Sequence, residues 1–187
     1  MTKTVCIILS DGFEEVEAIY PADIFKRLGL NIILAGLNKT NICGTHGINI
    51  QTSLTIKDID VSDFDALMLP GGLPGTTNML ESPQLLDLVK KSYQNNKIIA
   101  AICAAPTILH KAGITQNKTT TGYPSCENLI TNNDFKFSGK MVEVSQNIIT
   151  AIGMGQAAPF AFAIAKSLGI SDSQINQIKQ SAFILYD

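Results

Sequence analysis

The sequence predicts an α/β fold in which one mostly parallel sheet is covered by helices on both faces. Short apolar runs without polar alternation recur along the chain, which is typical of strands buried on both faces. Segments with the helical spacing of apolar residues separate these runs. Apolar residues make up 45% of the 187 residues and charged residues only 16%, against a usual charged share of about 25%. A chain of this length is expected to fold as a single domain over residues 1–187.

The first half of the chain alternates between apolar runs and amphipathic segments. The apolar runs are four to six residues long, as strands are, and a stretch rich in turn residues with short alternation predicts a hairpin or a bulged edge. In chain order, we expect a strand at residues 5–9, a helix at 14–28, a strand at 31–35, the hairpin or bulged edge at 44–51, a strand at 66–69 and a helix at 83–93.

The second half repeats the alternation and then adds short strands separated by Ser-Gly-Lys and Gln-Asn turns. Its last two segments have helical spacing. We expect a strand at residues 97–102, a helix at 104–111, a candidate strand at 119–121, short strands at 135–137, 141–145 and 148–152, and helices at 156–168 and 173–182.

Charge and cysteine usage narrow the classes of function. The net charge is −2 and the lysines are scattered singly, so nucleic acid and anionic membranes are poor candidate partners. The longest nearly unbroken apolar stretch, residues 98–109, is too short to cross a bilayer. A strand-like run follows the first few residues directly, so we expect no signal peptide. The four cysteines form no Cys-x-x-Cys pair. This pattern argues against a zinc site and predicts reduced thiols and a cytoplasmic location.

Cys103 is the candidate nucleophile. It follows the apolar run 98–102 and precedes Ala-Ala-Pro, so the chain turns there from strand to helix, with Pro106 suited to the first helical turn. Such an elbow tolerates only small neighbours, and Ala101 and Ala105 are small. The helix start is expected to favour thiolate over thiol, and the Ala104 N–H is positioned to face an oxyanion. A buried cysteine in a seam of small residues is the alternative.

Glu17 is the candidate acid. It lies on the line of Phe13, Tyr20, Ile24 and Leu28, which is the apolar side of the first predicted helix. A buried glutamate needs a partner or a raised pKa. The functional interpretation is a protonated acid or proton shuttle beside the cysteine, and the alternative is a partly exposed acid at a helix start.

Three loops fall at the carboxyl ends of predicted strands, where ligands bind in such sheets: residues 10–13, 70–75 and 103–106. The second contains Gly71-Gly72, which allows backbone amides to approach a ligand or simply makes a turn. The segments SDGFEEVEAIYPADIFKRLG, DALMLPGG, IIAAICAAPTIL and TGYPSCENL, in this order and spacing, resemble the ThiJ/PfpI superfamily. The similarity is to the branch of the Parkinson-disease protein (DJ-one) and bacterial YajL, and it covers nearly the whole chain.

The resemblance implies a flavodoxin-like doubly wound sheet, a homodimer and no organic cofactor. It implies that Cys103 is the nucleophile and Glu17 the protonated glutamate. It further implies that backbone N–H groups of Gly71, Gly72 and Ala104 surround the sulfur and bind the oxyanion or substrate.

Some positions depart from the wider family or carry no role. Tyr123 stands where many relatives have a histidine. YajL-like members share an aromatic residue there, and Tyr123 is expected to line the substrate site.

His46 is interpreted as a surface or interface residue and His110 as structural. Residues 153–158 fit G-x-G-x-x-A, but too little chain follows for a dinucleotide fold. Ala104 after Cys103 argues against peptide hydrolysis and ammonia transfer.

The resemblance therefore implies an enzyme of the glutathione-independent glyoxalase or protein deglycase type. Its substrates would be small aldehydes such as methylglyoxal, or their early adducts on proteins. The alternative is a non-enzymatic oxidative-stress sensor or chaperone in which Cys103 is oxidised to sulfinate. A flavodoxin-like binding module without a reactive thiol is a third possibility. The sequence leaves the role of Cys126 open.

Overall fold

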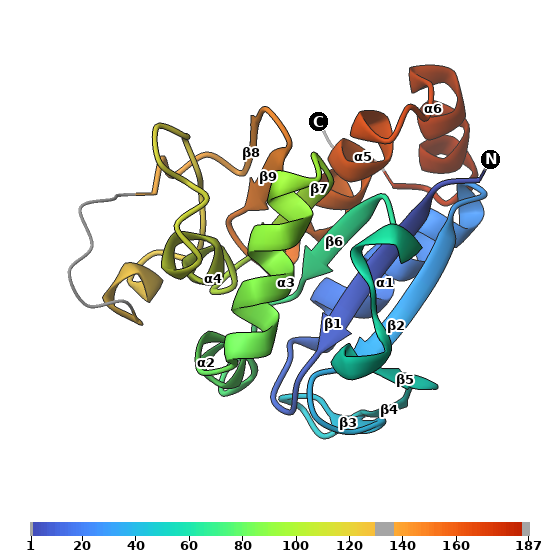
Figure 1. The fold of residues 1–187 in the computed structure, drawn as a ribbon. Coiled ribbons are helices and arrows are strands. Elements are labelled where there is room, and N and C mark those ends of the chain that lie inside the picture. The colour runs from blue at the N-terminus through green and yellow to red at the C-terminus, as the bar shows by residue number, and fades with distance from the viewer. Residues whose placement is uncertain (1, 130–136, 185–187) are drawn as a thin grey trace.

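A seven-stranded sheet runs through the centre of the computed structural model, which describes residues 2–129 and 137–184 (Figure 1). Its spatial order is β5-β2-β1-β6-β7-β9-β8, and β3 and β4 form a separate two-stranded hairpin. The strands are β1 (Thr4–Leu9), β2 (Asn31–Gly36), β3 (Asn41–Cys43), β4 (Asn49–Gln51), β5 (Leu54–Thr55), β6 (Ala66–Leu69), β7 (Ile98–Ile102), β8 (Val142–Ser145) and β9 (Ile148–Ala151).

All neighbours in the large sheet are parallel except β8 and β9. The register places Val5 of β1 between Ile32 of β2 and Ala66 of β6. The five inner strands β2-β1-β6-β7-β9 have the flavodoxin-like order, in which the connections reverse direction on either side of β1. The predicted doubly wound α/β fold is confirmed.

Helices cover both faces of the sheet, and Figure 1 shows α3 across one face with α5 and α6 on the other side. Alternate residues of β1 serve the two faces: Val5 and Ile7 pack with α1 and α5, and Cys6 and Ile8 pack with α3 and α4. All four are fully buried. The helices are α1 (Glu15–Arg27), α2 (Gly75–Leu80), α3 (Pro83–Gln94), α4 (Pro106–Lys111), α5 (Ala157–Ser167) and α6 (Asp172–Ser181).

Most predicted elements lie where expected, and the differences are local. Residues 119–121 form no strand, because Thr121 donates its N–H to the Thr150 hydroxyl and not to a neighbouring backbone. The predicted hairpin is present, but its first strand, β3, begins earlier, at Asn41. The short elements β5 and α2 had no sequence signal. Of the strand expected at 135–137, residues 135 and 136 lie outside the described chain, and Phe137 is not in a strand.

Among the described residues, no helix combines the length and apolar character needed to cross a membrane.

Candidate functional site

The three predicted loops meet at the carboxyl edge of the sheet, beside the point where the connections reverse around β1. The Glu14 N–H donates to the Gly71 carbonyl at 2.9 Å, and the Gly75 N–H donates to the Gly12 carbonyl at 3.2 Å. These bonds join the loop after β1 to the loop after β6. The Cys103 N–H donates to the Ala151 carbonyl at 2.9 Å, which ties the end of β7 to β9.

Cys103 occupies a strained elbow between β7 and α4. Its φ of +63° lies in the left-handed region, which non-glycine residues rarely adopt. The chain reverses within one turn, since the Ala105 N–H donates to the Ile102 carbonyl at 3.0 Å and α4 starts at Pro106. Cys103 is half-buried. The backbone conformation is that expected of a nucleophile elbow.

Glu17 projects from α1 into the interior and is fully buried. Its Oε2 accepts a hydrogen bond from the Gly71 N–H at 2.9 Å, whereas its Oε1 has no hydrogen-bonding oxygen or nitrogen partner in the described chain. Burial raises the pKa of Glu17 from its ordinary 4.5 to about 7, and the Gly71 N–H and the Cys103 thiol only partly oppose that rise. The predicted buried acid with a raised pKa is therefore present, and it lies against the predicted nucleophile.

The expected lowering of the Cys103 pKa is wrong. Burial raises the pKa of the thiol, and the charge and hydrogen-bond acceptance of an ionised Glu17 raise it further. Only the Ala104 N–H acts in the opposite direction. The helix start contributes little because α4 is only six residues long and begins three residues after the sulfur. Near neutral pH Glu17 therefore exchanges between its acid and carboxylate forms, and in the carboxylate form it lies beside a thiol whose proton it can accept.

The backbone donors around the sulfur divide into two roles. The Gly71 N–H is already engaged by Glu17, so Gly71 positions the acid and does not serve the oxyanion as the resemblance implied. A Cβ at Gly71 would lie 2.7 Å from the Cys103 Cβ and 2.8 Å from the Glu17 Oε2, which explains the need for glycine there. The Ala104 N–H points to the sulfur. The Gly72 N–H makes no hydrogen bond to another described residue, so both amides are candidates to bind an oxyanion.

Tyr123 forms the outer rim of the site. Its N–H donates to the Cys103 carbonyl at 2.7 Å, and the residue is 52% exposed. A Cβ built on Gly153 would lie 3.6 Å from the Tyr123 ring, so the glycine-containing turn after β9 borders the same rim. Met154, in that turn, is also exposed. The rim is therefore apolar, and the tyrosine ring offers no imidazole base.

His110 lies in the last turn of α4 and bonds Thr115 and Thr120 through its two ring nitrogens. Burial lowers its pKa to about 4. A neutral ring held by two hydroxyls fits the structural role that was predicted.

Glu15 has a role that the sequence analysis did not find. Its carboxylate accepts hydrogen bonds from the His46 N–H at 2.8 Å, the His46 ring at 2.9 Å and the Ile48 N–H at 3.4 Å. Glu14, Glu15 and His46 each bring a potential metal-ligand atom within 4.8 Å of the others, but the Glu15 oxygens are already occupied by these donors. Glu15 thus anchors the β3–β4 hairpin to α1. No spacing pattern distinguishes it from an ordinary acid in a first helical turn.

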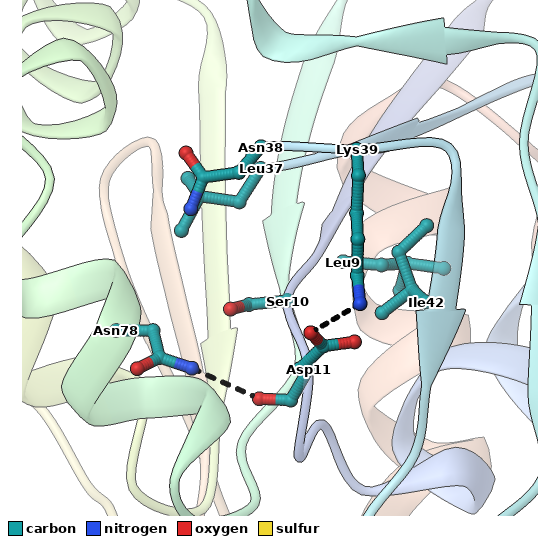
Figure 2. Close-up of a pocket in the computed structure, with 8 residues that line it drawn as sticks. All are labelled: Leu9, Ser10, Asp11, Leu37, Asn38, Lys39, Ile42 and Asn78. Atoms are coloured by element: carbon teal, nitrogen blue, oxygen red, sulfur yellow. Dashed lines mark hydrogen bonds and ion pairs between the residues drawn. The ribbon is translucent and has the colours of Figure 1, made fainter.

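The loop after β1 also borders a separate pocket of about 120 Å³ at the ends of β1 and β2 (Figure 2). Figure 2 shows Asp11 between two partners: the Lys39 ammonium at 2.7 Å from its carboxylate and the Asn78 amide, which donates to its carbonyl at 3.1 Å. The predicted loop 10–13 therefore contributes to both this pocket and the site around the thiol. Ser10 and Asp11 line this pocket, and the chain beyond Gly12 turns toward Gly71 and the thiol.

Comparison with known proteins identifies the family of this chain. The model of the DJ-1/PfpI family matches residues 3–167. The chain is 34% identical to the Drosophila melanogaster protein dj-1beta over 188 aligned positions, covering all of both chains. The crystal structure of Drosophila DJ-1beta superposes with a TM-score of 0.90 at 35% identity, again over both complete chains. A Caenorhabditis elegans protein named glutathione-independent glyoxalase DJR-1.2 is 32% identical over 167 residues, with 89% of each chain covered.

Proposed function

The chain belongs to the DJ-1/PfpI family, and on that premise we propose that it is a cysteine-dependent enzyme acting on reactive dicarbonyls. The reaction is of the glutathione-independent glyoxalase or protein deglycase type, with Cys103 as nucleophile and Glu17 as proton carrier. Substrates are small aldehydes such as methylglyoxal or their early adducts on proteins. A relative named as a glutathione-independent glyoxalase supports this class of reaction.

One observation carries the proposal: a half-buried thiol at φ +63° lies against a fully buried carboxyl group whose pKa is about 7. A general acid–base group works best when its pKa is close to the ambient pH. The two groups share a proton in either of two arrangements, thiol with carboxylate or thiolate with carboxylic acid. Proton transfer to Glu17 produces the nucleophile without leaving two negative charges together in a buried site.

The first step is addition of the sulfur to the aldehyde carbon. The S–C bond forms, the carbonyl π electrons move to oxygen, and the thiol proton passes to Glu17. The amides of Gly72 and Ala104 stabilise the developing oxyanion, and Glu17 passes the proton on to that oxygen, which gives a hemithioacetal and restores the carboxylate. Tyr123 lines the outer side of the bound substrate.

The second step moves a proton between neighbouring carbons. The Glu17 carboxylate removes the proton from the carbon that carries sulfur and returns it to the adjacent carbon. The hydroxyl proton moves from the oxygen of the first carbon to the oxygen of the second, and the hemithioacetal becomes a thioester of a 2-hydroxy acid. Water then attacks the thioester, the C–S bond breaks, and the hydroxy acid leaves with the thiol restored. The net change is addition of one water to the dicarbonyl, so no organic cofactor or metal enters the scheme.

Homodimer formation in the cytoplasm is part of the same proposal. Ile19, Ile48 and Leu73 are exposed apolar residues, and hydrogen bonds from the hairpin to α1 and to the Leu73 carbonyl hold their segments together. A second copy of the chain would cover this surface. Light scattering at micromolar concentration checks it, and a monomer would contradict this part of the proposal alone.

The direct test is production of lactate from methylglyoxal by the wild type and by Cys103→Ser and Glu17→Ala. We expect turnover to be lost in Cys103→Ser and to fall by about a hundredfold or more in Glu17→Ala. Undiminished turnover in Cys103→Ser would end the proposal.

A redox-sensor or chaperone role is the second candidate, favoured by the half-buried Cys103 next to a protonatable Glu17. Oxidation by mild peroxide would give a sulfinate that the protonated acid hydrogen-bonds. Selective gain of two oxygens at Cys103 in a protein without aldehyde turnover would favour this role over catalysis.

A further inference from the structure

Cys126 lies within one short turn of the Cys103 backbone. The Tyr123 N–H donates to the Cys103 carbonyl at 2.7 Å, and the Cys126 N–H donates to the Tyr123 carbonyl at 3.1 Å. Two consecutive hydrogen bonds therefore connect the elbow to the second thiol. Cys126 begins the 3-10 helix η3 (Cys126–Leu129), directly after Ser125, whose φ is +75°. Both thiols are free and half-buried in this structure.

The two thiols and Glu17 also share one electrostatic environment. Burial is the main cause that raises the pKa of Cys126, followed by the charges of Glu127 and Glu17. Cys126 in turn contributes to the raised pKa of Cys103. The remaining cysteines do not act on Cys103: Cys6 is fully buried in the core, and Cys43 lies in β3 with its thiol directed to the Gly44 carbonyl.

We infer that Cys126 is a resolving thiol, which makes the pair a reversible redox site for hydroperoxides. This inference rests on the proposed role of Cys103 as a nucleophile. It adds a second residue and a second outcome, because a nearby resolving thiol diverts the oxidised cysteine away from irreversible sulfinate.

The chemistry proceeds in two balanced steps. Cys103 attacks hydrogen peroxide, the O–O bond breaks and the sulfur gains OH as a sulfenic acid, while the second oxygen takes up the thiol proton and leaves as water. Cys126 then attacks the Cys103 sulfur, so the S–S bond forms, the S–O bond breaks and a second water leaves. The Cys126 thiol proton passes to the departing hydroxyl and leaves in that water. Two thiols of an external dithiol reduce the disulfide and restore the starting state.

The η3 turn must close toward the elbow for the S–S bond to form, since a disulfide requires Cα atoms about 4.4–6.8 Å apart. Among the bonds that hold η3 are two local backbone bonds, from Cys126 to Tyr123 and from Asn128 to Ser125. Closure must therefore rearrange these bonds.

The experiment treats the full-length protein with a stoichiometric amount of hydrogen peroxide, followed by intact-mass measurement and peptide mapping. The variants are Cys126→Ser and, as a matched control with another half-buried thiol, Cys43→Ser. We expect wild type and Cys43→Ser to lose two hydrogens, with residues 103 and 126 linked, and to recover fully in dithiothreitol. Cys126→Ser should instead gain two oxygens at Cys103 and not recover.

The outcomes separate this inference from the proposed function. If wild type gains two oxygens at Cys103 as readily as Cys126→Ser, the resolving role is wrong and the nucleophile stands. A disulfide that persists in Cys126→Ser would also overturn it. If Cys103 reacts with neither peroxide nor iodoacetamide, the proposed function itself fails.

Discussion

Two glutamates in the first turn of α1 are nearly or fully excluded from solvent, yet their pKa values move in opposite directions. Glu15 is 7% exposed and Glu17 is 0% exposed. Burial acts to raise the pKa of both. At Glu15 the His46 ring and the backbone N–H groups of His46 and Ile48 reverse this effect and bring the pKa below its ordinary value. At Glu17 the opposing donors are the Gly71 N–H and the thiol, and the pKa is about 7.

The difference shows that the number of donors, and not burial alone, decides what a carboxyl group can do. A carboxylate satisfied by several N–H groups is a fixed anchor, because removing its charge loses those bonds. A carboxyl group with one N–H donor and an oxygen without an oxygen or nitrogen partner can take up and release a proton near neutral pH. The helix thus carries an anchor for the hairpin and a proton carrier for the thiol within three residues.

The largest expected effect is on the rate of catalysis, and it distinguishes Glu17 from Glu15. Glu17→Gln should lower methylglyoxal turnover by about a hundredfold or more, because the proton carrier is lost. In the wild type, titration of Glu17 should change the rate of Cys103 alkylation near pH 7. This step in the plot of alkylation rate against pH should be absent from Glu17→Gln. Glu15→Gln is the matched control and should keep that step. A step near pH 7 that survives in Glu17→Gln would remove Glu17 from the mechanism.

The next effect is on stability and follows the sign of the Glu17 pKa shift. Because the folded-state pKa is raised from 4.5 to about 7, the folded protein holds a proton that the unfolded chain releases, and stability falls as pH rises through this window. Glu17→Gln has no such loss. Its free energy of unfolding should match that of wild type near pH 4.5 and exceed it by about 3 kcal/mol above pH 8. Denaturant titrations at several pH values measure this, and a constant difference would contradict the raised pKa.

The third prediction concerns the single N–H donor of Glu17. Gly71→Ala places a Cβ 2.7 Å from the Cys103 Cβ and 2.9 Å from the Ile102 carbonyl oxygen, so the elbow or the loop must shift. We expect a loss of about 1–3 kcal/mol in stability, together with reduced thiol reactivity. Gly155→Ala is the control, since its Cβ would meet nothing within 4 Å. Equal effects of the two substitutions would mean that the contacts around Gly71 are not tight.

The smallest effect concerns Glu15, the residue that anchors the β3–β4 hairpin to α1. The lowered pKa of Glu15 gives stability that is present above its unfolded pKa near 4.5 and is lost as pH falls through its folded value. The raised pKa of His46, caused by Glu15 and then Glu14, gives stability that is lost as pH rises above 6.5 through its folded value. Glu15→Gln should therefore be destabilising by about 1 kcal/mol, most between these two limits. A difference that grows at high pH would assign the anchor to something other than this pair.

Local pattern was enough to predict the fold and the two central residues. The bounds of β6 agree with the predicted strand, and β1, β7 and α3 differ from their predictions by one residue. These elements were predictable because apolar runs, and the Pro or Gly residues that end them, are signals within a few residues of the chain. Short elements such as β5 and α2 escaped prediction since their hydrogen bonds depend on partners distant in the chain. The same limit applies to Glu15, whose partners lie more than thirty residues away in the hairpin.

The sequence by itself determined that Cys103 lies on an elbow and that Glu17 faces the interior, because both follow from spacing along one strand or one helix. Only the tertiary structure decided how these groups ionise. The Gly71 N–H donates its hydrogen bond to Glu17, and the pKa of the Cys103 thiol rises instead of falling. Cys126 interacts electrostatically with both Cys103 and Glu17. Each of these depends on which dipoles and charges converge from separate loops, and that convergence exists only once the sheet has brought its carboxyl ends together.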